Sequence, residues 1–195
     1  MKKALCTTAL LVTASMNSQA DVIGAKAGYD FWKTANHGDA HTVYVQIEHP
    51  IPLVPNVALQ ANKIDSDKLE LNSYDLSGYY EILDNGNVSL DLGLGLRRLD
   101  SGKIYNQSFS DTLPMLTADM TLFPDSQFSF YGKINAGKSS DSTITDASAG
   151  VRFALFAGAS LQASYRSYTL DLDGTKGVNN KETIRGPQIG LHIDI

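Results

Sequence analysis

The segment VSLDLGLGLRR (Val88–Arg98) alternates strictly between two kinds of residue along its eleven positions. Its even-numbered residues from Val88 to Leu96 are all apolar, whereas its odd-numbered residues are small or charged. Successive side chains of a β-strand point to opposite faces, so the segment predicts a strand with one apolar face and one polar face. A tilted strand needs roughly 9–11 residues to cross a lipid bilayer, and this segment has that length.

The same alternation recurs along the chain, and no segment shows a convincing apolar stripe of helical period. This pattern predicts an all-β protein made of consecutive antiparallel hairpins. We expect an antiparallel up-and-down transmembrane β-barrel of ten strands, with eight strands as the alternative if the third or the fourth segment does not span. The ten segments are Val22–Trp32, Ala40–His49, Asn56–Ile64, Lys68–Leu83, Val88–Arg98, Leu113–Phe123, Phe128–Lys138, Ile144–Leu155, Ala159–Leu172 and Thr183–Ile195.

The fourth of these segments changes phase along its length. Its apolar residues Leu69 and Leu71 are odd-numbered, whereas Leu76 and the apolar residues after it are even-numbered. If all apolar side chains share one face, a β-bulge near Ser73 must accommodate the slip. A polar stretch, Asp100–Asp111, follows the fifth segment and predicts a loop.

The first twenty residues, Met1–Ala20, predict a secretory signal peptide. Lys2 and Lys3 give it a positively charged start, a short apolar stretch follows, and Ser18–Ala20 has the small-x-small pattern of a cleavage site. The apolar stretch is far shorter than the roughly 18 residues of a membrane-spanning helix. Residues 21–195 are therefore expected to form one barrel domain, without cysteine because the single Cys6 lies in the signal peptide.

The exported chain is acidic. Of the 16 basic residues, Lys2 and Lys3 belong to the signal peptide, which leaves 14 against 21 acidic residues and a net charge of −7. This charge argues against nucleic-acid binding. No nucleophile-elbow motif is present, and the scattered His and Asp residues near 37–41 and 171–182 form no complete metal-ligand pattern. We expect no catalytic, cofactor or metal site, and hence no enzyme.

Alternation alone does not tell which face of the strands is buried. A soluble lipocalin-type barrel turns its apolar face inward, whereas a membrane barrel turns it to lipid. The polar faces are rich in Gly, Ser, Thr and Asn, which suit the crowded lumen of a narrow membrane barrel. Aromatic residues also gather at strand ends in two bands, as in the girdles of membrane barrels. The expected periplasmic band contains Tyr80, Phe123, Phe128, Phe130, Phe153 and Phe156, and the expected outer band contains Tyr29, Phe31, Trp32, Tyr74 and Tyr165.

The last strand carries Gln188, Gly190, Ile193 and Ile195, a pattern that resembles the C-terminal assembly signal of bacterial outer-membrane barrels, which usually end in an aromatic residue. The opening segment Ala20–Trp32 is similar to that of a poorly characterised family of small proteobacterial outer-membrane β-barrel proteins. The resemblance implies the outer membrane of a Gram-negative bacterium, with outer-membrane lipid, lipopolysaccharide, the barrel-assembly machinery and periplasmic chaperones as partners. It implies no activity and no cofactor, and we expect a monomer.

A barrel of eight to ten strands has an interior about wide enough for its own side chains. We expect inward charges of both signs to pair and plug the lumen, because an isolated buried charge costs several kcal/mol. The expected function is structural or surface-interacting; a small-solute, cation-preferring channel is the alternative, and a lipid-modifying enzyme is a third. Glu70 and Asp75 are also expected to point inward. The predicted lumen network contains Lys26, Asp30, Glu48, Glu81, Asp91, Arg97, Asp119, Lys133, Arg152, Arg166 and Asp194.

Overall fold

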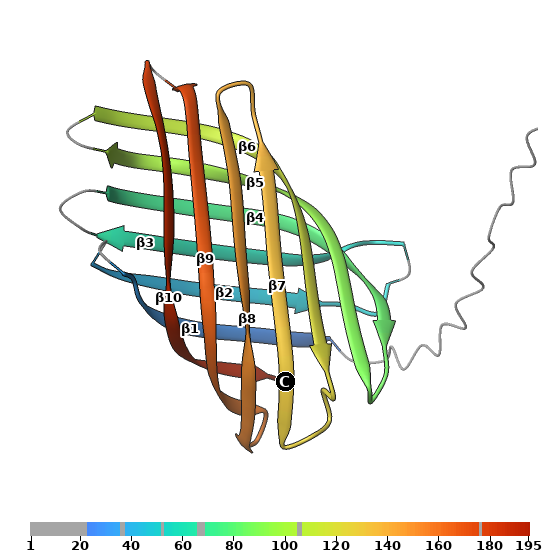
Figure 1. Ribbon diagram of the computed structural model, residues 1–195. Helices are drawn as coiled ribbons and strands as arrows, with labels where there is room; N and C mark the ends of the chain where they lie inside the picture. The colour runs from blue at the N-terminus through green and yellow to red at the C-terminus, as the bar shows by residue number, and fades with distance from the viewer. Residues whose placement is uncertain (1–22, 36–37, 52, 66–68, 105–106, 176) are drawn as a thin grey trace, which may run out of the picture.

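Ten antiparallel strands close into a barrel in the computed structural model, which describes residues 23–35, 38–51, 53–65, 69–104, 107–175 and 177–195. Each strand pairs with its neighbours in sequence, and β1 closes the barrel against β10 (Figure 1). The predicted ten-stranded, all-β fold is therefore confirmed, and the eight-stranded alternative is wrong. The strands are β1 Gly24–Lys33, β2 Asp39–Glu48, β3 Asn56–Asp65, β4 Leu69–Asp84, β5 Val88–Ile104, β6 Gln107–Leu122, β7 Phe128–Lys138, β8 Ser142–Phe156, β9 Ala159–Thr175 and β10 Val178–Asp194.

The described ranges contain no helix that is long and apolar enough to cross a membrane. The predicted signal peptide, Met1–Ala20, lies outside the described residues, so its cleavage stays a prediction.

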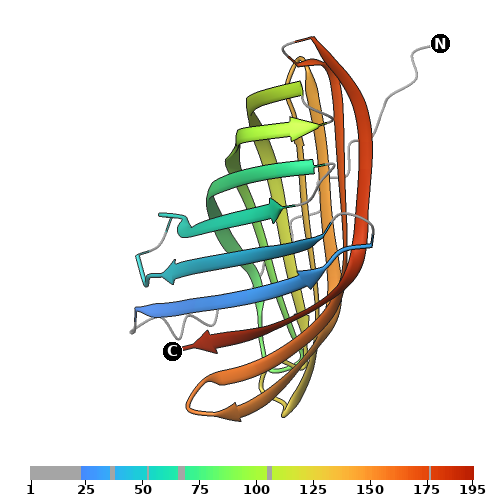
Figure 2. The same ribbon diagram turned by 90° about the vertical axis from the view of Figure 1, so that its left-hand side faces the viewer.

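The barrel has two unlike ends. The first and last described segments meet at one end, where Ala25 and Ile195 exchange two backbone hydrogen bonds of 2.7 and 3.0 Å. Figure 2 places the C-terminus beside the start of β1. We call this the terminal end. The opposite end, where β1 continues to β2, β3 to β4, β5 to β6, β7 to β8 and β9 to β10, is the loop end.

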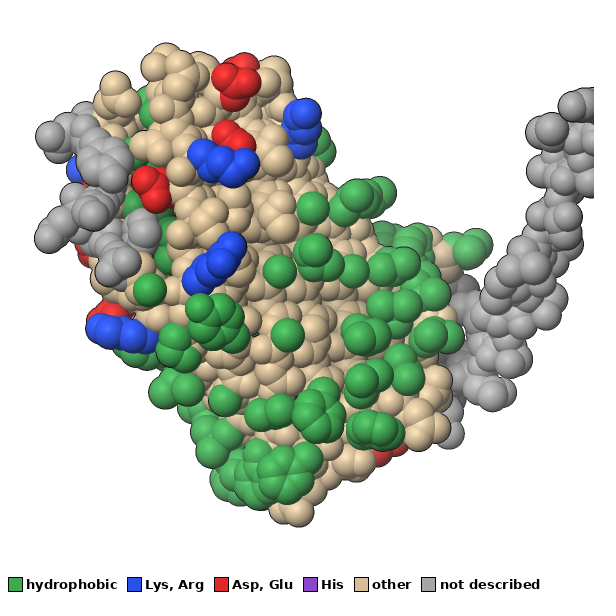
Figure 3. Space-filling model, in the orientation of Figure 1, with side chains coloured by type: hydrophobic (Ala, Val, Ile, Leu, Met, Phe, Trp, Pro, Cys, Tyr) green, Lys and Arg blue, Asp and Glu red, His purple; other side chains and the backbone are tan. Residues whose placement is uncertain are grey.

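Hydrophobic and polar faces exchange places between the two ends. In the terminal half of β5, Leu92, Leu94 and Leu96 point outward and are 43–67% exposed. In the loop half of the same strand, Leu99 points inward with no exposed surface, while Arg98 points outward. The outer surface is thus apolar near the terminal end and polar near the loop end, a division visible in Figure 3.

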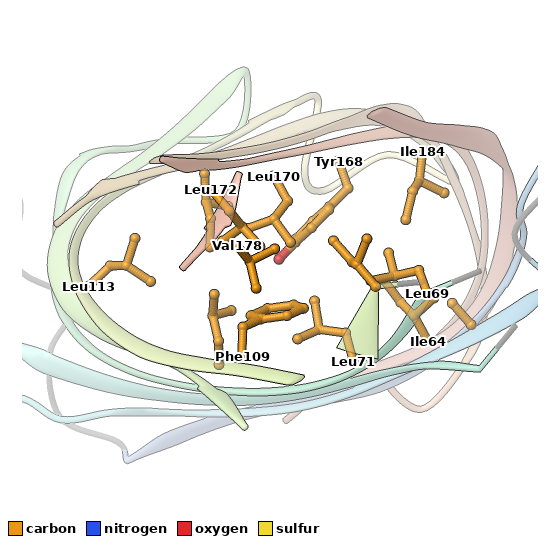
Figure 4. Close-up of a cluster of buried hydrophobic side chains, with 14 of the residues drawn as sticks. Ile64, Leu69, Leu71, Phe109, Leu113, Tyr168, Leu170, Leu172, Val178 and Ile184 are labelled. Carbon is orange, nitrogen blue, oxygen red and sulfur yellow. The ribbon is translucent and has the colours of Figure 1, made fainter. Parts of the chain in front are cut away.

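An apolar core fills the loop half of the barrel. Its side chains come from nearly every wall and point toward one another across the interior (Figure 4). Burying one large apolar side chain contributes roughly 1.5–3 kcal/mol, so this cluster is a major source of stability. The core consists of Trp32, Ala40, Ile64, Leu69, Leu71, Leu99, Ile104, Phe109, Leu113, Ile144, Tyr168, Leu170, Leu172, Val178 and Ile184.

This core corrects three predictions about the loop half. The expected change of phase at Ser73 does not occur, because the register between β3 and β4 is continuous and Leu69 and Leu71 point inward into the core. The register shifts of β4 lie against β5, between Glu70 and Asn72 and between Glu81 and Leu83. Glu70, between Leu69 and Leu71, points outward instead of inward. The predicted loop, Asp100–Asp111, is mostly strand, because β5 extends to Ile104 and β6 begins at Gln107. The first two predictions failed because they assumed that apolar side chains always face outward. The loop was predicted from polar residues that in fact share these strands with the buried Ile104 and Phe109.

The residues of both predicted aromatic bands point outward with one exception, although Phe31 and Phe153 are only partly exposed. Tyr29, Tyr74 and Tyr165 are exposed on the outer wall, on the side of the apolar band that is nearer the loop end, and a second group is exposed near the terminal end. Trp32, predicted for the outer band, is only 1% exposed because it has the inward parity of β1 and packs in the core. The exposed aromatic residues near the terminal end are Tyr80, Phe123, Phe128, Phe130 and Phe156.

Gly93 of β5 offers a test of packing inside the terminal half. A Cβ atom there would lie 2.6 Å from the carbonyl oxygen of Gly78 and 2.8 Å from Cβ of Tyr79. We expect Gly93→Ala to destabilise the barrel by about 1–3 kcal/mol, because the neighbouring strand has to shift. Urea unfolding followed by the fluorescence of Trp32, the only tryptophan, measures the change.

The control is Gly132→Ala on β7, where an added Cβ would lie 3.8 Å from the carbonyl oxygen of Ser148, an ordinary contact. We expect this variant to unfold within about 0.5 kcal/mol of the unmodified protein. Equal destabilisation by both alanines would contradict the packing described for Gly93.

Candidate functional site in the barrel interior

A layer of four buried charged side chains lies directly beneath the apolar core. Arg97 of β5 donates two hydrogen bonds to Asp75 of β4, at 2.7 Å from Nε and 2.5 Å from Nη2. Arg166 of β9 binds both oxygens of Asp146 of β8, at 2.8 and 2.7 Å. A further bond of 3.2 Å from Arg97 Nη2 to Asp146 joins the two pairs. We call Asp75, Arg97, Asp146 and Arg166 the ionic layer; paired arginine–carboxylate contacts of this kind combine strength with fixed geometry.

Neutral side chains extend the ionic layer across the barrel. Arg166 donates to Thr42 of β2 at 2.8 Å and to the side-chain oxygen of Asn62 of β3 at 3.0 Å. Its guanidinium also lies 4.9 Å from the ring centroid of Trp32, within cation–π distance. Arg97 lies 5.8 Å from the ring of Tyr168 in the same way. The layer therefore links strands on opposite walls and ties the polar interior to the apolar core.

A cavity of about 560 Å³ occupies the interior between the ionic layer and the terminal end. Asp146 and Arg166 form part of its inner limit, and the turn residues Asp84, Asp125 and Gly158 form part of its rim. The cavity consequently opens at the terminal end and is closed toward the loop end.

Ion pairs and hydrogen bonds line the outer part of this cavity. Lys26 binds Glu48 at 2.5 Å, and Tyr79 donates to the same carboxylate at 3.1 Å. Lys133 lies 3.5 Å from Asp119 on the neighbouring strand. These pairs are part-exposed, so removing one partner costs less stability than breaking a fully buried pair of the ionic layer.

Three carboxylates stand side by side near the rim. Glu81, Asp91 and Asp119 occupy paired positions on β4, β5 and β6. Glu81 accepts a hydrogen bond of 2.9 Å from Asn56. Among the described residues, no group of three His, Cys, Asp or Glu side chains is placed to hold a metal ion.

The inner part of the cavity holds a second polar cluster. Gln162 of β9 donates to Asp30 of β1 at 2.6 Å and accepts from Arg152 at 3.1 Å. The Arg152 guanidinium lies 4.5 Å from the ring centroid of Tyr131. Amide, carboxylate and guanidinium groups therefore stabilise one another here, and they join β8 and β9 to β1 at the other end of the chain.

The predicted lumen residues fall into two sets. Arg97 and Arg166 enter the ionic layer, and the pairs Lys26–Glu48 and Lys133–Asp119 line the cavity. The remaining five form no ion pair within 4 Å among the described residues, although the hydrogen bonds given above hold some of them. These five are Asp30, Glu81, Asp91, Arg152 and Asp194.

Sequence reasoning missed Asp146, the residue that joins the two arginines. It lies in a predicted strand at the same parity as Arg152, so its inward orientation could have been read from the alternation. Its pairing with Arg97 and Arg166 could not be read from the alternation, because these partners lie on other strands, β5 and β9. Glu70, expected inside, instead pairs with Lys103 on the outer surface at 3.0 Å.

The residues of the predicted assembly signal lie on both faces of β10. Gln188 is buried in the interior, and Gly190 lies against Asp30 and Tyr29 of β1. Ile193 and Ile195 point outward and are 45% and 73% exposed. Their role in assembly stays a prediction.

No protein-family model matches the chain, and no curated protein matches it in sequence. Among solved structures, the chain is similar to the NanC porin, with a TM-score of 0.43 and 11% identity, covering 88% of this chain and 99% of that one. It is similar to Neisserial surface protein A, with a TM-score of 0.39 and 16% identity, covering 89% and 96%. It is also similar to the N-terminal β-barrel domain of Pseudomonas aeruginosa OprF, with a TM-score of 0.40 and 11% identity, covering 88% and 97%. These TM-scores lie below 0.5, so we base the function on this chain's own residues.

The ionic layer predicts a large effect of Asp146→Asn. The change removes the charge that both Arg97 and Arg166 contact, and leaves buried guanidinium groups without full compensation. We expect a loss of about 3–5 kcal/mol in the free energy of unfolding, the usual result of breaking a buried ion pair from one side. Urea unfolding followed by Trp32 fluorescence measures it.

Asp119→Asn is the matched control, because Asp119 is 29% exposed and its contact with Lys133 is 3.5 Å long. We expect it to change stability by less than about 1 kcal/mol. If the two substitutions destabilise the protein equally, the ionic layer does not have the special contribution assigned to it.

Proposed function

We propose that this chain is an integral outer-membrane β-barrel with a closed lumen and a structural or surface-interaction role. The observation that carries the proposal is the filling of the barrel cross-section by the apolar core and the ionic layer. In this arrangement the terminal half spans the lipid, the loop half extends beyond it, and the cavity opens toward the periplasm.

The outer surface of the terminal half supports a location in lipid. Every strand contributes at least one exposed, outward-facing large hydrophobic side chain there. A soluble monomer rarely exposes a continuous apolar patch larger than a few hundred Å², and a band around a whole barrel exceeds this. A lipid environment removes the free-energy cost of exposing these apolar side chains to water, because lipid replaces water around them. Representative residues, one from each strand in order, are Tyr29, Val43, Leu59, Leu76, Leu94, Leu116, Phe130, Val151, Leu161 and Ile189.

The interior of the loop half supports a closed lumen. Leu99, Phe109, Leu113 and Leu170 are at most 1% exposed, so they leave no aqueous passage through their part of the core. Ions would have to cross this apolar cluster after the ionic layer. Moving an ion into such surroundings costs many kcal/mol.

A cation channel is the second candidate, and the charge of the cavity favours it. Cations are attracted to an interior with more carboxylates than basic groups. Passage would nevertheless require the apolar core to move aside, because the cavity ends beneath it. The acidic lining residues are Asp30, Glu48, Asp84, Asp91, Asp119, Asp125, Asp146 and Asp194, and the basic ones are Lys26, Lys133, Arg152 and Arg166.

Conductance measurements separate these two candidates. We expect the purified, folded protein to give no steady conductance in a planar bilayer, because the core blocks the passage between the cavity and the loop end. Insertion is checked in parallel by the different gel migration of boiled and unboiled samples. Large, stable, cation-selective steps would refute the closed lumen and favour the channel.

A charge placed on the outer wall tests the location in lipid. Leu92 points outward in the terminal half, so Leu92→Arg should destabilise the barrel in phospholipid vesicles by about 2–4 kcal/mol if it lies near the midplane. The control is Asn179→Arg, an exposed position near the loop end, where a change within about 0.5 kcal/mol is expected. Urea titration of the vesicle-inserted proteins gives both values. Equal, small effects would place the terminal half in water.

A further inference from the structure

The outer surface is electrostatically asymmetric in a way that the closed lumen does not explain. Twelve Lys and Arg residues lie in the described ranges, and five of them point into the barrel interior. The other seven point outward, and all of them lie in the loop half, as the blue side chains in Figure 3 illustrate. The outward seven are Lys33, Lys63, Arg98, Lys103, Lys138, Lys181 and Arg185.

Five of these cations lie at the border of the apolar band. Each occupies the next outward position beyond the last apolar outward residue of its strand, because side chains two residues apart share a face. We call these five the cationic collar. The border pairs, apolar residue first, are Phe31 and Lys33 on β1, Ala61 and Lys63 on β3, Leu96 and Arg98 on β5, Ala136 and Lys138 on β7, and Pro187 and Arg185 on β10.

The opposite border of the apolar band carries no matching charge. Among the described residues near the terminal end, no Lys or Arg side chain points outward, and the turns there contain Asp84 and Asp125. The two borders of the apolar band therefore differ in charge. Lipid headgroups at the border nearer the loop end would meet cations, whereas headgroups at the border nearer the terminal end would meet carboxylates.

The position of the collar determines what its cations can reach. A Lys or Arg at the border of an apolar band lays its aliphatic stem on the apolar surface and extends its charge to the headgroups. The collar side chains extend into the surroundings of the barrel: Lys33, Lys63 and Arg98 are 58–66% exposed, and Lys138 and Arg185 are also exposed. Phosphate groups are the anions found at this depth, and cations near an anionic lipid surface gain about 1 kcal/mol each.

Acidic neighbours divide the collar into two classes. Lys33 lies 2.7 Å from Asp39. Lys63 and Arg98 each have a more distant carboxylate, Asp65 at 3.6 Å and Asp100 at 3.7 Å respectively. Lys138 and Arg185 have no carboxylate within 4 Å among the described residues. These two cations are therefore the most available to an anionic ligand.

We propose that the cationic collar binds the phosphate groups of lipid A in the outer leaflet, with Lys138 and Arg185 as the principal contacts. The assignment rests on the proposed function, which directs the loop end away from the periplasm and so toward the leaflet made of this phosphorylated glycolipid. Charge complementarity at the border of the band selects the headgroup, and the absence of outward cations near the described terminal end restricts the contact to one leaflet.

The test compares two double variants of the folded full-length barrel. Lys138→Gln with Arg185→Gln removes two collar charges. The matched control, Lys103→Gln with Lys181→Gln, removes two outward cations that lie farther from the apolar band and pair with Glu70 and Asp171 at 3.0 and 2.8 Å. Binding of fluorescent, doubly phosphorylated lipid A in detergent micelles should weaken roughly 25-fold in the collar variant, from about 5-fold per charge. The control should change less than about 3-fold, because its cations are already paired.

The same titration with phosphatidylglycerol identifies the source of the phosphate. A smaller loss for phosphatidylglycerol than for lipid A supports the assignment, whereas an equal loss for both lipids overturns it. An equal loss in the collar and control variants overturns the role of the collar itself. Membrane insertion, measured by gel migration before and after boiling, is tested separately: if the unmodified protein does not insert, the proposed membrane function fails, whatever the binding result.

Discussion

Closure of the sheet is the constraint on which the rest of this structure depends. The pairing of β1 with β10 leaves no strand edge unpaired, so every strand is bonded on both sides. A closed barrel satisfies its backbone hydrogen bonds internally, which is the condition for placing strands in lipid. It also fixes each side chain as inward or outward, so that two neighbouring residues always meet different surroundings. Alternation in the sequence is the direct expression of this geometry.

The surroundings on each side change along the barrel axis, and the residues change with them. In the terminal half the outer wall is apolar and the interior is polar, whereas in the loop half the order is reversed. The ionic layer lies where the polar interior meets the apolar core. Arg166 illustrates the transition, because it binds Asp146 through hydrogen bonds while stacking on Trp32 of the core. The barrel thus joins two halves whose hydrophobic patterns are inverted relative to each other.

The sequence was sufficient to predict the number of strands, because alternation reports strand geometry directly. It did not predict the inward direction of Leu69 and Leu71, since alternation is symmetric and gives the same pattern whichever face is buried. Parity identified Arg97 and Arg166 as interior residues, but their meeting at Asp146 depends on barrel diameter and strand stagger, which join β5, β8 and β9 across the lumen. Contacts across the lumen are therefore the part of the site that local patterns do not contain.

The polar outer wall of the loop half has a consequence for biogenesis. In the proposed orientation, this half has to pass through the bilayer before it reaches the far side, together with its outward charges. Glu70 and Lys103 pair across adjacent strands, as do Asp171 and Lys181. Each hairpin that carries such a pair presents little net charge to the hydrocarbon, so its electrostatic barrier to translocation is lower than that of two separate ions. The surface ion pairs, which contribute little to equilibrium stability, would then matter most during transit.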